Sequence, residues 1–226
     1  MKKEILIIVP SRSAGTGREN NVERFIQHWM LFTDGHSDIC VSLDDDDEHY
    51  YDRYEGIIYT VNPNERLVPK LNRAADKFKD EYKAIAFFGD DHVIKSNWEI
   101  EFLNYVEKNN GVGIVYGNDL LQSEKLPTAV CMTSNIISAL GYMVLPTLLH
   151  MYADNFWLDL GKSTDNIKYF PNVIWEHMHP DNGKANRDNQ YNHAASVAEI
   201  DRVKYYEYLN SQHYIDDINK ILKLKK

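Results

Sequence analysis

The stretch Ala84-Ile85-Ala86-Phe87-Phe88-Gly89-Asp90-Asp91-His92 joins five apolar residues to two adjacent carboxylates and a histidine. A short continuous apolar run is typical of a strand whose two faces are both covered, as in a parallel sheet. Ligands bind beyond the carboxyl ends of the strands in such sheets. The stretch therefore predicts that Asp90 and Asp91 lie at a ligand-binding edge, and the alternative is an acidic turn that caps the next helix.

On either side of this stretch, strand-like and helix-like segments alternate. The residues expected in strands are Ile5–Val9, Ile39–Leu43, Gly56–Val61, Ala84–Phe88 and Gly113–Tyr116. The residues expected in helices, from apolar positions at helical spacing, are Glu19–Phe32, Pro69–Phe78 and Trp98–Val106. This alternation predicts an α/β fold with a mostly parallel central sheet flanked by helices.

After Leu120 the pattern is less regular. We expect strands at Thr128–Met132 and Asn172–Glu176, and helices at Ile136–Met143, at Pro146–Leu160 and from Ala194 onward. No linker or repeat divides the chain. We therefore expect one catalytic domain over 1–193, made of a nucleotide-binding half (1–92) and an acceptor half (93–193), and a C-terminal helical extension over 194–226.

The composition excludes several classes of protein. The chain has 226 residues, and 43% of them are hydrophobic, which argues against wholesale disorder. Its 25 basic and 34 acidic side chains give a net charge of −9, which argues against a broad nucleic-acid-binding face. Cys40 and Cys131 are too few for a disulfide framework.

No segment reads as a targeting or membrane-spanning sequence. The apolar run Ile5–Val9 is too short for a signal peptide, and the long apolar stretch Ile136–Met151 is interrupted by Gly141, Pro146 and His150. We expect a cytoplasmic protein that is not an integral membrane protein.

Polar residues follow other predicted strands as well. Pro10, Ser11 and Arg12 follow the first strand, and Asp44 follows the second. The carboxylates of Asp90 and Asp91 are oxygen ligands that suit Mg²⁺ or Mn²⁺, and these ions keep coordination positions for substrate phosphates. The rest of the acidic run, Asp45 to Glu48, is typical of a solvated loop.

Two histidines follow the last predicted strand. His177 and His179 are two residues apart, and we expect the strand to continue through them, so that their side chains share one face. They could be metal ligands, core residues or an exposed pair.

Three predicted strands occur in a characteristic order: the first ends in Val-Pro-Ser-Arg, the second in Asp44 and the third in Gly-Asp-Asp. This order resembles the GT-A glycosyltransferases, especially those similar to family 2. The stretches Tyr152–Leu158 and Tyr169–His177 extend the resemblance, which covers roughly residues 5 to 180. It implies a GT-A (Rossmann-like) fold of the kind that handles nucleotide-diphospho-sugars.

The resemblance also implies roles for particular residues. Pro10, Ser11, Arg12, Asp44 and Asp90 would contact the nucleotide. Asp91, in the place of the family's DxD motif, would bind Mn²⁺ or Mg²⁺, joined by His177 or His179. Asp154 would match the catalytic base, and Lys184, placed by spacing, would add positive charge to a loop over the diphosphate.

Together these roles predict a metal-dependent glycosyltransferase. Inversion of the configuration at the anomeric carbon is favoured over retention. The enzyme would move a sugar from a nucleoside-diphosphate sugar, with a UDP-sugar favoured, to a hydroxyl acceptor. Two departures from the family pattern stand out: Ala153-Asp154 retains one carboxylate of the usual acidic pair, and Asp90-Asp91-His92 replaces the D-x-D spacing. Asp154 could instead be a first-turn helix carboxylate.

Two other functions fit parts of the sequence. A nucleotide-sugar-binding protein without turnover would share the fold and the metal affinity. A dinuclear zinc hydrolase is suggested by His177-Met178-His179-Pro180-Asp181, although Asn182 stands where that signature has a histidine.

Overall fold

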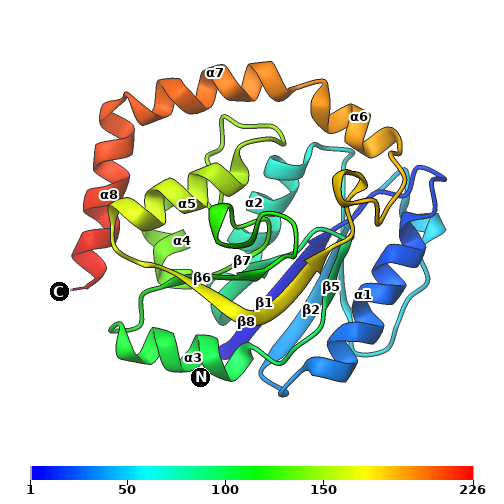
Figure 1. Cartoon of the computed structure of the whole chain (residues 1–226), viewed down its shortest axis with the longest axis horizontal. Helices are drawn as coiled ribbons and strands as arrows, with labels where there is room; N and C mark the ends of the chain where they lie inside the picture. The colour runs from blue at the N-terminus through cyan, green and yellow to red at the C-terminus, as the bar shows by residue number, and fades with distance from the viewer. Residues whose placement is uncertain (1, 226) are drawn as a thin grey trace.

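Strand β1 (Lys3–Pro10) is an inner strand of an eight-stranded sheet in the computed structural model, which describes residues 2–225 (Figure 1). The order across the sheet is β3-β2-β1-β4-β7-β6-β8-β5. The other strands are β2 Ser37–Asp44, β3 Ile58–Asn62, β4 Tyr82–Phe87, β5 His92–Ile94, β6 Ile114–Asn118, β7 Val130–Thr133 and β8 Ile167–His177.

Helices cover both faces of this sheet. They are α1 Arg18–Phe32, α2 Leu67–Phe78, α3 Glu99–Lys108, α4 Ser134–Leu140, α5 Ala153–Ser163, α6 Asn189–Ala195, α7 Ala198–Leu209 and α8 Gln212–Leu224. Short 3-10 turns occupy Glu48–Tyr50, Ser123–Lys125 and Pro180–Asn182.

The side chains of β1 alternate between two hydrophobic cores because successive residues of a strand point to opposite faces. Ile5, Ile7 and Val9 pack in a core with residues of α1 and α3. Leu6 and Ile8 pack in the other core, with residues of α2, α4 and α5. All five are fully buried, as expected for a strand that is covered on both faces.

The predicted α/β fold with a mostly parallel sheet is confirmed. Strand β1 pairs in parallel with β2 and β4, and β6 pairs in parallel with β8. The exceptions are β7, which is antiparallel to β4 and β6, and β5, which is antiparallel to β8. The carboxyl ends of β1, β2 and β4 consequently meet at one edge.

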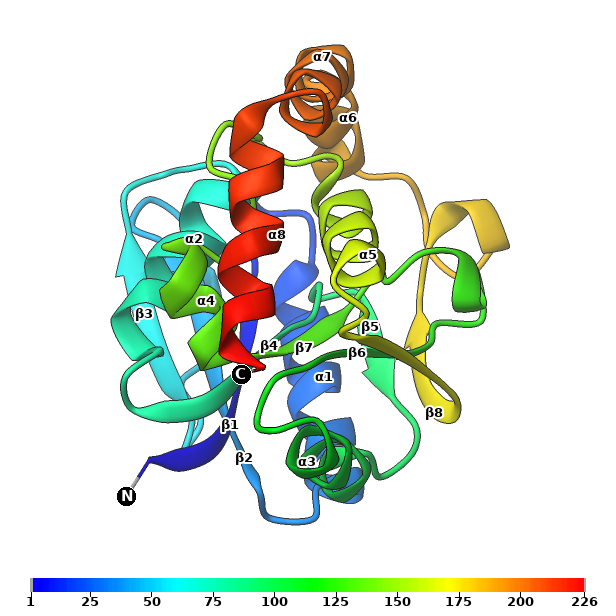
Figure 2. The ribbon, with the colours of Figure 1, turned by 90° about the vertical axis from the view of Figure 1, so that its left-hand side faces the viewer.

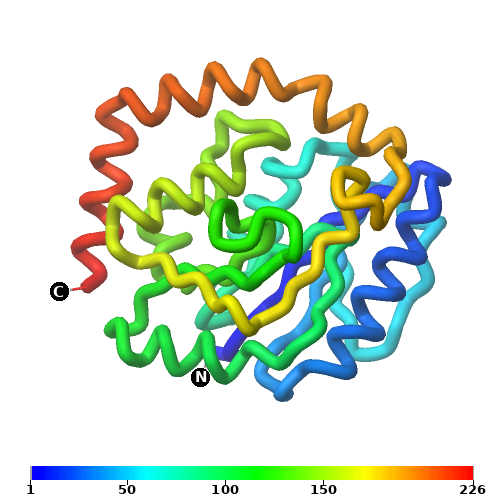
Figure 3. Tube along the Cα trace, viewed as in Figure 1, coloured from blue at the N-terminus to red at the C-terminus, as the bar shows by residue number. Residues whose placement is uncertain are grey.

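The C-terminal helices run around the outside of the molecule: the tube in Figure 3 passes from α6 along the top in α7 and then down the left side in α8. Figure 2 shows α8 from its outer side, beside α4 and α5. Tyr205, Tyr208 and Ile221 are buried in the same core as Phe156 of α5. The division at residues 193 and 194 stays a prediction, and α6 spans it. Among residues 2–225, no helix has the length and apolar composition needed to cross a membrane.

One predicted helix is wrong. The segment Pro146–Leu160 was expected to be helical, but α5 begins only at Ala153 and continues past Gly161 to Ser163. Three consecutive backbone N–H groups in the preceding segment, those of residues 149 to 151, donate to the buried carboxylate of Asp201 instead of to helix carbonyls. The apolar pattern of this segment reflects burial against the core, not helical periodicity.

Candidate active site

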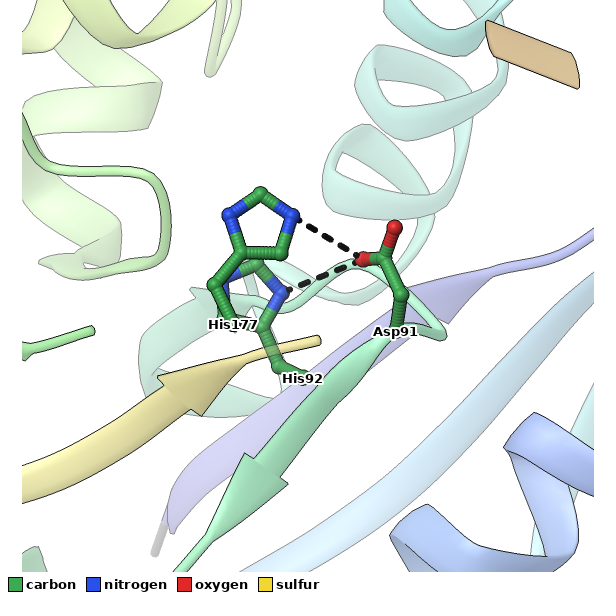
Figure 4. A group of neighbouring side chains, drawn as sticks. All are labelled: Asp91, His92 and His177. Carbon is green, nitrogen blue, oxygen red and sulfur yellow. Dashed lines mark ion pairs between the residues drawn. The ribbon is translucent and has the colours of Figure 1, made fainter. Parts of the chain in front are cut away.

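The loop after β4 and the end of β8 bring three potential metal ligands together (Figure 4). Oδ1 of Asp91 lies 3.5 Å from Nδ1 of His92 and 3.4 Å from Nε2 of His177. The two imidazole rings stack with their centroids 4.3 Å apart and 15° between their planes. One ligand atom from each residue lies within 4.8 Å of the others. The Asp91–His92–His177 group can therefore surround a single cation.

Antiparallel pairing of β5 with β8 creates this group. His92 is the first residue of β5 and pairs with His177, the last residue of β8. The register thus places two imidazoles side by side at the sheet edge. Asp91 directly precedes β5, and its backbone carbonyl accepts a hydrogen bond from the N–H of Met178 at 2.8 Å.

The charges in the group depend on one another. Burial favours the neutral form of Asp91, but its contacts, foremost the one with His177, outweigh this and hold its pKa well below the usual range. Burial lowers the pKa of His92, and the neighbouring His177 adds to this. Burial also acts against a charge on His177, but Asp91 outweighs it and raises the pKa of that histidine. The result is an ionised carboxylate facing two histidines.

The residues fit a divalent cation. Nδ1 of His92 is buried, points toward Asp91 and has no hydrogen-bond partner within the part of the chain that the structure describes. A Cβ atom on Gly89 would lie 2.6 Å from Oδ1 of Asp91, so the carboxylate needs glycine at this position in order to face the imidazoles. One carboxylate and two imidazoles suit Mn²⁺ better than Mg²⁺, which prefers oxygen ligands.

Asp90 faces away from this group into a network of its own. Oδ1 of Asp90 pairs with a guanidinium nitrogen of Arg18 at 2.5 Å, and Oδ2 accepts a hydrogen bond from the hydroxyl of Ser11 at 2.5 Å. Arg18 in turn pairs with Asp188 at 2.8 Å, which ties α1 to the segment before α6. Burial raises the pKa of Asp90, although Arg18 opposes this effect and Asp91 reinforces it.

Asp44 lies at the end of β2 in a second ion-pair network. It is fully buried, 2.7 Å from Nζ of Lys70 and 3.0 Å from a guanidinium nitrogen of Arg12. Arg12 also pairs with the exposed carboxylate of Asp46 at 2.6 Å. Among Asp44, Lys70 and Arg12, the partly exposed Arg12 is the one that a ligand can reach.

A cavity of about 410 Å³ opens above the Asp91–His92–His177 group. Its lining brings together Pro10 and Asp90 from the predicted nucleotide site, and Asp154 from the predicted catalytic position. Ser11, Arg12, Asp44 and Lys184 lie outside the lining of this cavity.

Asp154 stands in the first turn of α5, on the wall of the cavity. Its Oδ1 accepts a hydrogen bond from the N–H of Asn155 at 2.9 Å. Burial raises the pKa of Asp154, while the backbone hydrogen bond and the nearby His177 oppose the shift. A carboxylate with a raised pKa beside an open cavity has the properties of a general base.

The two remaining predicted residues have other partners. The expectation that His177 and His179 share a strand face is wrong, because β8 ends at His177. His179 precedes the turn Pro180–Asn182, and its Nδ1 accepts a hydrogen bond from the N–H of Asp181 at 3.1 Å. The ring of His179 still lines the cavity, 4.9 Å from that of His177. Lys184 pairs with Glu176 at 2.5 Å.

Sequence reasoning did not single out several residues of the site. His92 was not assigned to the metal, and no role was assigned to Arg18 or Tyr191. The hydroxyl of Tyr191 donates to Oδ2 of Asp91 at 2.8 Å, and its ring lies 5.1 Å from the guanidinium of Arg18.

Comparisons with known proteins add information on the fold. No protein-family model and no curated protein sequence matches the chain. Among solved structures, the mannosyltransferase PcManGT from Pyrobaculum calidifontis, in complex with GDP-Man and Mn²⁺, gives a TM-score of 0.61 at 10% identity over 99% of this chain and 70% of that one.

TarS from S. aureus is also similar. Residues 1–349 of that protein give a TM-score of 0.58 at 13% identity over 98% of this chain and 71% of that one. The same region in complex with UDP-GlcNAc gives 0.55 at 11% identity, over 97% of this chain and 70% of that one. This chain spans 36% of the longer TarS structure. The chain shares the GT-A fold of these structures.

Proposed function

We propose that this chain is a metal-dependent glycosyltransferase that moves a sugar from a nucleoside-diphosphate sugar to a hydroxyl acceptor. One observation carries the proposal: the Asp91–His92–His177 group and the carboxylate of Asp154 line the same cavity in a GT-A fold. The cavity volume of about 410 Å³ lies within the range of small-molecule sites, roughly 300–1,000 Å³.

Asp91, His92 and His177 would hold Mn²⁺, or Mg²⁺ less favourably, with His179 as a further candidate close by. A cation bound there supplies stabilisation of the negative charge that develops on the leaving diphosphate. Arg18 lines the same cavity and presents a guanidinium, which binds phosphate oxygens well. Its present partners, Asp90 and Asp188, hold it in place.

The nucleoside would lie at the carboxyl ends of β1 and β2. Pro10, Ser11, Arg12 and Asp90 remain the proposed contacts, and Arg12 is the member that is both charged and partly exposed. The fully buried Asp44 would take part by holding Arg12 in place. Lys184 remains a proposed diphosphate contact and would have to leave Glu176 to act as one. A UDP-sugar is favoured, in keeping with the UDP-GlcNAc complex of TarS; a GDP-sugar is the other candidate, because PcManGT was solved with GDP-Man.

Asp154 would take the proton of the acceptor hydroxyl as that oxygen attacks the anomeric carbon. Attack from the side opposite the diphosphate inverts the configuration at that carbon. The raised pKa of Asp154 makes its carboxylate a stronger base than an exposed aspartate.

Turnover and binding are tested separately. Wild-type protein and Asp154→Asn are incubated with UDP-sugars and GDP-sugars, Mn²⁺ and an acceptor panel, and release of nucleoside diphosphate is measured. We expect donor binding by both proteins and release by the wild type alone. Binding without release by the wild type would favour a nucleotide-sugar-binding protein, and release of equal rate by Asp154→Asn would refute the assignment of the base.

A further inference from the structure

Thr128 connects His92 to a buried carboxylate outside the candidate metal group. Oγ1 of Thr128 donates a hydrogen bond to Oδ2 of Asp119 at 2.8 Å and lies 3.3 Å from Nε2 of His92. Asp119 is 2% exposed. These contacts form a continuous chain from Asp119 through Thr128 to His92.

The direction of the hydrogen bonds in this chain follows from the surroundings of Asp119. Its Oδ1 accepts hydrogen bonds from the backbone N–H groups of Leu121, Gln122 and Ser123, at 2.9, 2.7 and 2.8 Å. Three N–H donors favour the ionised carboxylate, which can only accept. The hydroxyl hydrogen of Thr128 must therefore point toward Asp119.

This direction determines which nitrogen of His92 carries the proton. The Thr128 oxygen, having given its hydrogen to Asp119, can only accept from Nε2 of His92. A neutral imidazole that carries its proton on Nε2 has its lone pair on Nδ1. Nδ1 is the atom that faces Asp91, 3.5 Å from Oδ1, and no group in residues 2–225 forms a hydrogen bond with it.

We propose that Asp119 and Thr128 form a relay that fixes His92 as the Nε2–H tautomer and so presents the lone pair of Nδ1 to the cation site. The use of this lone pair rests on the proposed metal-dependent function. Thr128 and Asp119 are positioning residues in this relay. His177 has no such support, because its Nδ1 is buried without a hydrogen-bond partner among the described residues.

The tautomer can be read without any metal. The full chain, labelled with 15N-histidine and kept with a chelator at about pH 8, well above the ordinary histidine pKa, is studied by long-range 1H–15N NMR. The spectrum of His92→Gln identifies the His92 signals. We expect the wild type to show Nε2–H; a wild type with Nδ1–H, bonded toward Asp91, would overturn the proposal.

Asp119→Asn should reverse the direction of the hydrogen bonds between residue 119, Thr128 and His92. The three backbone donors keep the amide oxygen in the place of Oδ1, so the amide NH₂ faces Thr128 and donates to it. The threonine hydrogen then turns to His92, and the expected tautomer is Nδ1–H. An unchanged tautomer in this variant would contradict the relay. Thr128→Val, which lacks the hydroxyl, should give a mixture of tautomers, and Thr128→Ser should keep the wild-type state.

Mn²⁺ titration of the same proteins by calorimetry tests the consequence for metal binding. Loss of an outer-shell partner typically weakens metal affinity about 10- to 100-fold. We expect a loss of this size in Thr128→Val and its recovery in Thr128→Ser. Equal affinity of Thr128→Val and wild type would overturn the positioning role. A wild type that binds no Mn²⁺ would instead refute the proposed function, while the NMR result would still decide the relay.

Discussion

The hydroxyl of Tyr191, in helix α6, donates a hydrogen bond to Oδ2 of Asp91 across 2.8 Å. The bond leaves Oδ1 of the same carboxylate facing the two imidazoles. A residue near the start of the C-terminal helices thereby contacts a carboxylate in the loop between β4 and β5, one hundred positions earlier in the chain.

Tyr191→Phe removes this hydrogen bond and keeps the ring. We expect Mn²⁺ affinity to fall by about tenfold, because hydrogen bonds to a ligating carboxylate hold it in its binding orientation. Calorimetric titration measures the change. Tyr206→Phe is the matched control, since Tyr206 is 50% exposed on α7. The same Mn²⁺ affinity in all three proteins would show that Tyr191 does not orient Asp91.

Asp201→Asn should destabilise the fold. The buried carboxylate of Asp201 accepts three backbone hydrogen bonds from the segment just before α5, one on Oδ1 and two on Oδ2. In asparagine one of these oxygens becomes an NH₂ group, which cannot accept, so at least one of the backbone donors loses its partner. Leaving buried donors unpaired costs about 1–3 kcal/mol. Urea unfolding should show a loss of this size in Asp201→Asn and almost none in Asp216→Asn, which changes an exposed aspartate of α8. Equal stabilities of the two variants would mean that the hydrogen bonds to Asp201 do not stabilise the fold.

His150 should make the free energy of unfolding depend on pH in the acid range. Burial lowers the pKa of His150 to about 4, and the nearby Arg66 adds to this. Between pH 4 and the ordinary histidine pKa of about 6.5, the unfolded chain binds a proton that the folded chain does not, so stability falls as the pH falls. The free energy of unfolding, measured at several pH values in this window, should fall less steeply in His150→Gln than in wild type. His49→Gln, at an exposed position, should keep the wild-type slope; identical slopes in all three would contradict the assignment.

The strand that ends in Gly-Asp-Asp could be predicted because its signal is local. Five consecutive apolar residues, Ala84 to Phe88, indicate a buried strand, and a parallel sheet then requires the following carboxylates to lie at its ligand-binding edge. The structure places Asp90, Asp91 and His177 at this edge, as this reasoning predicts.

The ligand grouping could not be predicted in the same way. The period-two rule paired His177 with His179, but the strand ends between them and His92 takes the neighbouring place through antiparallel pairing. Arg18 and Tyr191 reach Asp90 and Asp91 from positions 72 and 100 residues away. Such contacts depend on tertiary packing, which no local pattern contains.

The central claim is that Asp91 helps to hold a divalent cation that a nucleoside diphosphate requires. Calorimetric titration of UDP and GDP into wild type and Asp91→Asn, each with Mn²⁺ and with chelator, tests it most directly. We expect that at least one nucleotide binds the wild type only when Mn²⁺ is present, and that Asp91→Asn, folded but without this carboxylate, loses that binding. Equally tight Mn²⁺-dependent binding by the variant would contradict it.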